Sequence, residues 1–238
     1  MINKEKKLRQ EIAGKVKEIF ALRKKTKKFI PGKTWIQYAG GVFDDKEINA
    51  SIEVLIKGWF GLGEKADEFE KTLANFLNVK GSIITNSGSS SNFLAIASLM
   101  SPLWPNKLQR GDEVITSSCG FPTTVNPIVV NGLVPVFLDV NPNTYNLNAD
   151  DLENALSPKT KVVMLAHTLG NPNEMDKVVK FCQRHKLLLV EDNCDALGSE
   201  YDGQKTGSFG ILGTQSFYPP HHITMGEGGA VLYNDFRF

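Results

Sequence analysis

Short apolar segments alternate with helical patterns from about residue 44 to the end of the chain. The segments expected to be strands are residues 82–85, 113–117, 134–139, 161–166, 187–191, 213–218 and 230–233. Helical patterns fall between several of them, for example at residues 90–100 and 174–185. This alternation is typical of a parallel sheet covered by helices. We therefore predict one three-layer α/β/α domain with a seven-stranded, mostly parallel sheet and with ligands at the carboxyl ends of its strands.

The composition of the 238-residue chain argues against several classes of function. A formal charge of +1 gives no reason to expect nucleic acid or a membrane surface as the main partner. No apolar run approaches the roughly 20 residues that span a bilayer, and the first residues lack the hydrophobic region of a signal peptide. The three cysteines are odd in number and widely spaced, which indicates neither a disulfide framework nor a metal site. We expect a cytoplasmic protein whose site uses no metal.

Residues 1–28 carry a disproportionate share of the positive charge. They hold eleven Lys or Arg residues against three Glu residues, a net charge of +8. Apolar side chains recur there at helical spacing, at Leu8, Ile12, Val16, Ile19 and Phe20. We therefore predict a basic amphipathic helix over residues 1–30, followed by a linker turn at Pro31 and Gly32. Such a helix either docks on the rest of the protein by its apolar stripe or binds a phosphate-rich partner.

A turn of small polar residues follows the first predicted strand and directly precedes an apolar helix. Gly88, Ser89 and Ser90 stand in this turn. Unpaired backbone N–H groups at the start of a helix, together with the helix dipole, favour a bound anion. Serine and glycine also serve as ordinary caps and turns, so the motif alone leaves both interpretations open.

An aspartate, Asp192, stands at the end of the fifth predicted strand. A carboxylate at the end of a buried strand is unfavourable unless it meets a cation or several hydrogen-bond donors. A protonated pyridine nitrogen is one such partner, because the aspartate would keep the ring cationic and able to accept electrons. The alternative is an aspartate that caps the next turn. Asp195, three residues further on, has no assigned role.

Two adjacent histidines, His221 and His222, follow the sixth predicted strand. An imidazole takes and gives protons near neutral pH, whereas a lysine amine can also condense with an aldehyde to form a Schiff base. The ordinary alternative is a loop with a satisfied histidine pair. A metal site is disfavoured because no Cys, Asp or Glu stands nearby at ligand spacing. His221 is therefore a candidate base, and His222 has no assigned role.

In this order and spacing, the three motifs resemble the sugar aminotransferase family of fold type I pyridoxal phosphate enzymes, which aminate nucleotide-linked keto sugars. The resemblance covers nearly the whole chain from about residue 30. The positions that match the cofactor-binding residues of the family are Gly88, Ser89, Ser90, Phe121, Asp192 and Ser216. The resemblance implies that the Gly88 turn and Ser216 hold the cofactor phosphate, and that Phe121 stacks on the pyridine ring. Asp192 would then meet the ring nitrogen.

His221 stands where the family has its lysine tether, which narrows the resemblance to the 3-dehydratase branch. The most similar branch acts on CDP-linked 4-keto-6-deoxyglucose in lipopolysaccharide deoxysugar biosynthesis. The resemblance implies noncovalent pyridoxamine or pyridoxal phosphate, with His221 moving a proton so that the C3 hydroxyl of a nucleotide-linked 4-keto-6-deoxyhexose is expelled. A pyridoxal-phosphate-dependent nucleotide-sugar aminotransferase and a noncatalytic truncated paralogue are the alternatives.

The chain stops early for this family, whose members continue into a small C-terminal domain. We therefore expect residues 31–238 to be the large, cofactor-binding domain of a longer protein. The resemblance implies a homodimer with its active site at the subunit interface. It also implies an iron–sulfur (2Fe–2S) cluster in the C-terminal region beyond this chain, and a reductase as partner. The residues of this chain do not distinguish CDP from GDP.

Overall fold

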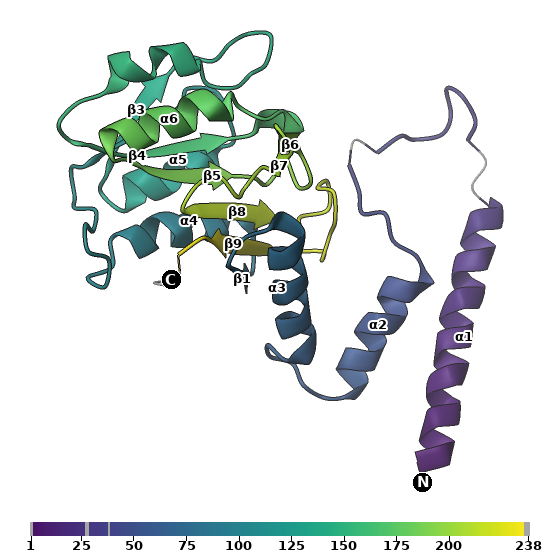
Figure 1. Cartoon of the computed structure of the whole chain (residues 1–238). Helices are drawn as coiled ribbons and strands as arrows, with labels where there is room; N and C mark the ends of the chain where they lie inside the picture. Colours follow the sequence, from purple (N-terminus) through teal and green to yellow (C-terminus); the bar gives the residue numbers. More distant parts are fainter. Residues whose placement is uncertain (1, 27–28, 38, 236–238) are drawn as a thin grey trace. The chain divides into compact units, whose positions relative to one another are not determined.

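The computed structural model describes residues 2–26, 29–37 and 39–235 of the chain (Figure 1). The chain divides into two compact units between Lys65 and Ala66. The domain boundary near residue 30 that the sequence suggested stays a prediction. None of the described helices is long and apolar enough to cross a membrane.

The first unit contains the helices α1 (Ile2–Thr26) and α2 (Asp45–Ile56). The helix predicted for residues 1–30 is present over residues 2–26 as α1; residues 29 and 30 are not helical, and residues 1, 27 and 28 lie outside the described part. Two contacts join α1 to the α2 segment: Arg9 donates to Glu53 at 2.8 Å, and the ring centroids of Phe20 and Phe43 lie 6.0 Å apart. Other side chains of the predicted stripe remain about half exposed, namely Leu8, Ile12 and Ile19. Docking of this stripe on the rest of the protein therefore stays a prediction.

A seven-stranded sheet forms the centre of the second unit (Figure 1). Its strands are β1 (Gly81–Thr85), β2 (Glu113–Ser117), β3 (Val134–Leu138), β4 (Thr160–Ala166), β5 (Leu188–Asp192), β8 (Leu212–Ser216) and β9 (Gly229–Tyr233). They lie in the order β1-β9-β8-β5-β4-β2-β3, and β9 alone runs against the others. The predicted mostly parallel sheet is thus confirmed, with each strand within two residues of its expected bounds.

Helices cover the sheet and complete the three layers. They are α3 (Glu64–Leu77), α4 (Gly88–Leu99), α5 (Pro122–Val130) and α6 (Met175–His185), with short 3-10 helices at Ala149–Ala155 (η1) and Thr168–Gly170 (η2). A hairpin of two short strands, β6 (Glu200–Tyr201) and β7 (Gln204–Lys205), stands outside the sheet. The strands of this hairpin carry no sequence signal, because two residues are too few to show a period of two.

Alternate residues of each central strand pack against different layers. In β4, Met164 belongs to the same buried cluster as Ile96 of α4, whereas Leu165 belongs to the cluster that contains Phe181 of α6. Each such side chain contributes about 1.5–3 kcal/mol when fully buried. A sheet buried on both faces explains why its strands appear in the sequence as nearly continuous apolar runs.

Pairing of β9 with β1 and β8 brings together the turn after β1 and the loop after β8. Gly229 of β9 pairs with Thr85 of β1 on one side and with Ser216 of β8 on the other. A Cβ atom at Gly229 would lie 2.4 Å from the backbone of Ser87, so only glycine fits there. The turn after β1 and the loop after β8 therefore start next to each other.

Candidate active site

A cavity of about 460 Å³ lies at the carboxyl ends of the strands. Residues that follow β1, β2, β4, β5 and β8 line it: Ser87, Gly88, Ser89, Gly120, Phe121, Thr123, Thr124, Ala166, His167, Thr168, Asp192, Cys194, Asp195, Ser216, Tyr218, Pro220, His221 and Glu227. Its volume is in the range of small-molecule and cofactor sites. Its position at the carboxyl edge is the one expected for ligands of a parallel α/β sheet.

The turn between β1 and α4 leaves two backbone donors facing the cavity region. The side chain of Ser87 caps α4 by accepting the N–H of Ser90 at 3.1 Å. Gly88 and Ser89 line the cavity, and within the described chain their N–H groups have no hydrogen-bond partner. Ser90 does not line the cavity, and its N–H group is used in the cap. The turn thus offers two free N–H donors at a helix N-terminus, where an anion is favoured.

Gly88 packs against the opposite wall so closely that a side chain does not fit. A Cβ atom there would lie 2.5 Å from Cβ of Ser216 and 3.0 Å from Sγ of Cys194. We expect Gly88→Ala to lower the free energy of unfolding by about 1–3 kcal/mol, because overpacking outweighs the small helix preference of alanine. Denaturant titration measures this change. The matched control is Gly120→Ala, whose Cβ would make an ordinary 3.6 Å contact with Ser117; an equal loss in both variants would contradict the argument.

Asp192 ends β5 and is almost fully buried beside the cavity. Its Oδ2 accepts hydrogen bonds from Nδ2 of Asn92 at 2.8 Å and from Oγ1 of Thr124 at 2.7 Å. Its Oδ1 accepts the backbone N–H of Cys194 at 3.2 Å. Several donors therefore compensate for burial of the carboxylate, which is the condition that the sequence analysis stated. Asp192 is not simply a cap of the following turn, because two of its donors come from α4 and α5.

His221 lines the cavity and lies beside Asp195. Nδ1 of His221 lies 3.4 Å from Oδ1 of Asp195, and the imidazole is largely buried. Burial lowers the pKa of His221 below its ordinary value, and the negative charge of Asp195 opposes that shift. The imidazole is therefore mostly neutral at neutral pH and able to accept a proton. Its neighbour His222 is exposed and does not line the cavity.

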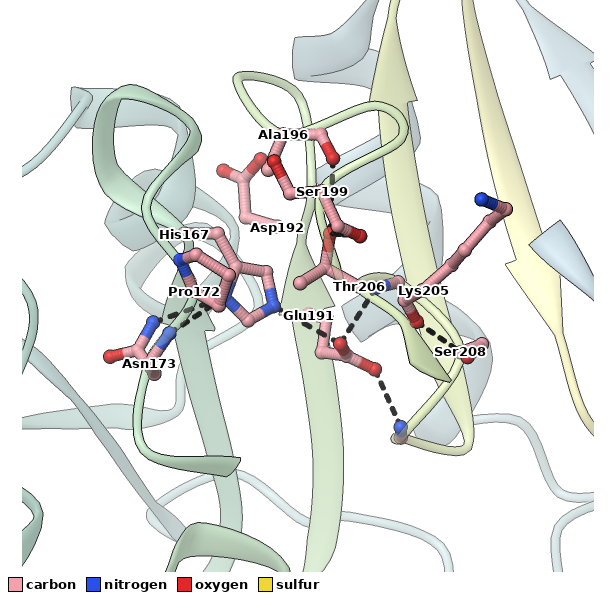
Figure 2. A network of polar contacts seen from close by, with 12 residues as sticks. His167, Pro172, Asn173, Glu191, Asp192, Ala196, Ser199, Lys205, Thr206 and Ser208 are labelled. Atoms are coloured by element: carbon pink, nitrogen blue, oxygen red, sulfur yellow. Dashed lines mark hydrogen bonds and ion pairs between the residues drawn. The ribbon is translucent and has the colours of Figure 1, made fainter. Parts of the chain in front are cut away.

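A second buried network lies directly beside Asp192 (Figure 2). Glu191 and His167 point toward one another, with Oε1 of Glu191 and Nε2 of His167 3.1 Å apart. Oε1 also accepts the N–H of Gly207 at 2.7 Å, and Oε2 accepts that of Gly210 at 2.6 Å. Nδ1 of His167 accepts the N–H of Asn173, so the ring proton must be on Nε2. This network joins the end of β4 and the loop at residues 207–210 to β5.

Most of the predicted site residues come together at this cavity. Gly88, Ser89, Phe121, Asp192, Ser216 and His221 line it, and Ser90 supports the turn from behind. Phe121 is 68% exposed, which leaves its ring face available to a ligand. Cys194 lines the cavity as well, but burial and the nearby Asp192 raise the pKa of its thiol well above the ordinary value. It is therefore a neutral thiol and not an activated nucleophile.

Sequence reasoning assigned no role to Asn92, Thr124, His167 or Glu191. Asn92 stands at the start of the apolar part of α4 and Glu191 follows the apolar part of β5, and both are essentially fully buried. Buried polar side chains usually have a specific hydrogen-bond partner. A polar residue next to an apolar run was therefore the sequence feature that could have identified Asn92 and Glu191. Thr124 and His167 carried no signal of this kind.

The sequence profile of the DegT/DnrJ/EryC1/StrS aminotransferase family matches residues 42–237. The chain is 47% identical over 226 residues to the lipopolysaccharide biosynthesis protein RfbH of Salmonella typhimurium, covering 94% of this chain and 52% of that protein. It is 50% identical over 205 residues to dTDP-4-dehydro-2,6-dideoxy-D-glucose 3-dehydratase of Saccharopolyspora spinosa, covering 86% of this chain and 44% of that protein.

A similar solved structure is that of E. coli GDP-4-keto-6-deoxy-D-mannose-3-dehydratase with bound hydrated PLP. It has a TM-score of 0.80 and 33% sequence identity, and the match covers 85% of this chain and 52% of that chain. The chain thus spans about half the length of these relatives. The profile match and the sequence identities show that the chain belongs to the DegT/DnrJ/EryC1/StrS aminotransferase family, which includes pyridoxal-phosphate-dependent sugar-modifying enzymes.

Proposed function

We propose that this chain is the cofactor-binding part of a nucleotide-sugar 3-dehydratase. The reaction is removal of the C3 hydroxyl from a nucleotide-linked 4-keto-6-deoxyhexose, in the biosynthesis of a 3,6-dideoxysugar for lipopolysaccharide. The cofactor is pyridoxamine phosphate, bound noncovalently. Relatives named as 3-dehydratases of nucleotide sugars support this choice.

One observation carries the proposal. His221 and Asp192 line the same cavity, and no lysine lines it among the residues that the structure describes. The last lysine of the chain is Lys205, before the loop that contains His221. A lysine would tether the cofactor covalently, whereas histidine only transfers protons. The absence of a lysine tether supports a dehydratase over an aminotransferase.

The residues present fit a phosphorylated pyridine cofactor. Two free N–H donors, of Gly88 and Ser89, with the hydroxyl of Ser216 nearby, suit the phosphate group. The exposed ring of Phe121 suits a stacked pyridine, and the carboxylate of Asp192 suits a protonated ring nitrogen. When bound, the cofactor supplies a ring that accepts electrons from the reacting bond.

The chain's own residues then orient the reactants and move protons. With the cofactor bound, Asp192 would hold a positive charge on the ring nitrogen and Phe121 would fix the plane of the ring. His221, neutral at neutral pH, would be the residue of this cavity that accepts a proton beside the reacting carbon. Asp195 pairs with the imidazole after it has gained that proton, because the carboxylate favours the charged form.

The test of the proposal combines product analysis with a trapping experiment. The protein is incubated with pyridoxamine phosphate and CDP- or GDP-linked 4-keto-6-deoxyhexose. Mass spectrometry should detect loss of one oxygen atom from the released sugar, together with pyridoxal phosphate and ammonia, because oxidation of the cofactor amine supplies the two electrons. Borohydride reduction of the protein with pyridoxal phosphate should leave no cofactor on a lysine. A lysine adduct together with glutamate-dependent amination of the sugar would instead identify an aminotransferase. Failure to bind either cofactor would favour a noncatalytic paralogue.

We expect Asp192→Asn to reduce turnover by about 100-fold, because a preorganised charge that stabilises the reacting state is lost. Retention of pyridoxamine phosphate should fall much less, since the phosphate contacts are unchanged. Equilibrium dialysis measures retention, and steady-state assays measure turnover. An equal loss of both would indicate that Asp192 has a folding role.

Further parts of the proposal concern the protein beyond this chain. The 3-dehydratase hypothesis includes a cytoplasmic location and a homodimer with its site at the subunit interface. It also includes an iron–sulfur cluster in a C-terminal region and a reductase partner. Residues 31–238 would form the large domain, and residues 1–30 a basic helix attached to it. Analytical ultracentrifugation of the full-length protein tests the homodimer, and metal analysis tests the iron–sulfur cluster.

A further inference from the structure

Asn92 and Thr124 belong to different helices, yet both donate to the same oxygen of Asp192. Their distances to Oδ2 are 2.8 Å and 2.7 Å, while Oδ1 accepts the backbone N–H of Cys194 at the longer distance of 3.2 Å. Asn92 is 1% exposed and Thr124 is 2% exposed, so water does not weaken these bonds. Side-chain donors therefore occupy Oδ2, and Oδ1 keeps more capacity to accept a further hydrogen bond.

Thr214 fixes the orientation of the Asn92 amide. Oγ1 of Thr214 lies 2.6 Å from Oδ1 of Asn92. An ionised carboxylate only accepts hydrogen bonds, so the amide NH₂ of Asn92 must face Asp192 and its oxygen must face Thr214. The threonine hydroxyl then donates to Asn92, and all three side chains are buried. The chain of bonds from β8 through α4 to β5 therefore has one consistent direction.

The charge of Asp192 depends on what faces it from the surrounding elements. Burial disfavours the ionised form, and hydrogen bonds to that form favour it. The titratable groups that face Asp192 are the neutral thiol of Cys194 and the imidazole of His221, with Asp195 beside them. Helices α4 and α5 contribute uncharged donors, and the thiol of Cys194 also hydrogen-bonds the carboxylate. Asn92 and Thr124 are thus the donors from the two helices that offset burial of this carboxylate.

We propose that Asn92 and Thr124 are positioning residues that keep Asp192 ionised and leave its Oδ1 available to the pyridine nitrogen of the cofactor. This inference rests on the role proposed above for Asp192. It assigns two roles to each helix region: α4 provides both the phosphate turn and Asn92, while Phe121 is the N-cap residue of α5 and Thr124 lies in the first turn of that helix. Each helix therefore couples a cofactor contact to the charge state of Asp192.

The test measures the protonation of Asp192 in the chain without cofactor, and turnover separately. Infrared spectroscopy of protein with isotope-labelled aspartate follows the band of the protonated carboxyl group against pH, and Asp192→Asn identifies that band. Asn92→Leu and Thr124→Val each remove one donor at similar volume. Each should make Asp192 bind its proton about tenfold more tightly, as expected for losing a hydrogen bond to a charged group. Turnover is compared on the pH-independent plateau, because protonation of His221 sets the acidic limb, and both variants should be slower there.

Two controls separate this role from general destabilisation. Thr124→Ser keeps the hydroxyl and should restore the wild-type titration. Asn148 donates a similar amide-to-carboxylate hydrogen bond, to Asp151 at 2.6 Å, away from the cavity. Asn148→Leu removes that bond and should leave the Asp192 band unchanged. An unchanged band in both Asn92→Leu and Thr124→Val overturns the inference. A wild-type protein that binds no pyridoxamine phosphate contradicts the proposed function instead, and the infrared titration still decides the role of Asn92.

Discussion

Replacing His221 with lysine is expected to impair dehydration and to allow covalent binding of pyridoxal phosphate. Dehydration should fall by about 100-fold or more, since general acid–base catalysis contributes at least that much. The new amine, partly desolvated at this position, should capture the aldehyde of pyridoxal phosphate and turn the protein yellow. Borohydride reduction followed by peptide mass spectrometry should locate the adduct on residue 221.

The neighbouring histidine provides the matched control. His222→Lys adds the same side chain one residue away, at an exposed position that does not line the cavity. It should capture no cofactor and retain dehydration. A His221→Lys protein that stays colourless and fully active would mean that the tether position has been assigned wrongly.

Replacing Glu191 with glutamine should produce the largest loss of stability. The wild-type carboxylate accepts three donors, from His167, Gly207 and Gly210. A glutamine amide has only one oxygen, so in either orientation its NH₂ group faces at least one of these N–H donors. We expect a loss of about 2–4 kcal/mol, because a buried donor is left without a partner and a hydrogen bond to a charged group is removed. A change of this size lowers Tm by roughly 10 °C in a domain of this length.

Differential scanning calorimetry measures that change, and Glu200→Gln is its control. Glu200 forms a surface ion pair with Lys205 at 2.8 Å, with its side chain half exposed. Such pairs contribute about 0–1 kcal/mol. If both variants lost the same small amount, the buried network would not be an important source of stability.

The strands could be predicted because both faces of the sheet are buried. An element such as β4, buried on both sides, needs apolar residues at nearly every position, which the sequence shows directly. The phosphate turn, Asp192 and His221 could be recognised because each follows such a strand. A parallel sheet then brings these loops to one edge without further information.

The partners of Asp192 could not be predicted from local pattern. Asn92 lies 100 residues before Asp192 in the sequence, and Thr214 lies 122 residues after Asn92. Periodicity reports which face of an element is buried, but not which polar side chains meet across two layers. The same holds for His167 and Glu191, whose pairing depends on the register of β4 against β5.

The place of β9 in the sheet has a consequence for how the protein is made. Among the described strands of the sheet this one comes last in the sequence, yet it lies between β8 and β1, the strand that comes first. Pairing between such distant segments forms slowly, and until it forms the edges of β1 and β8 are unpaired and prone to aggregation. A chain still emerging from the ribosome cannot align the turn after β1 with the loop that contains His221 until Gly229–Tyr233 has been released. For the proposed cofactor site, we therefore expect binding only after β9 has been synthesised and has paired with β1 and β8.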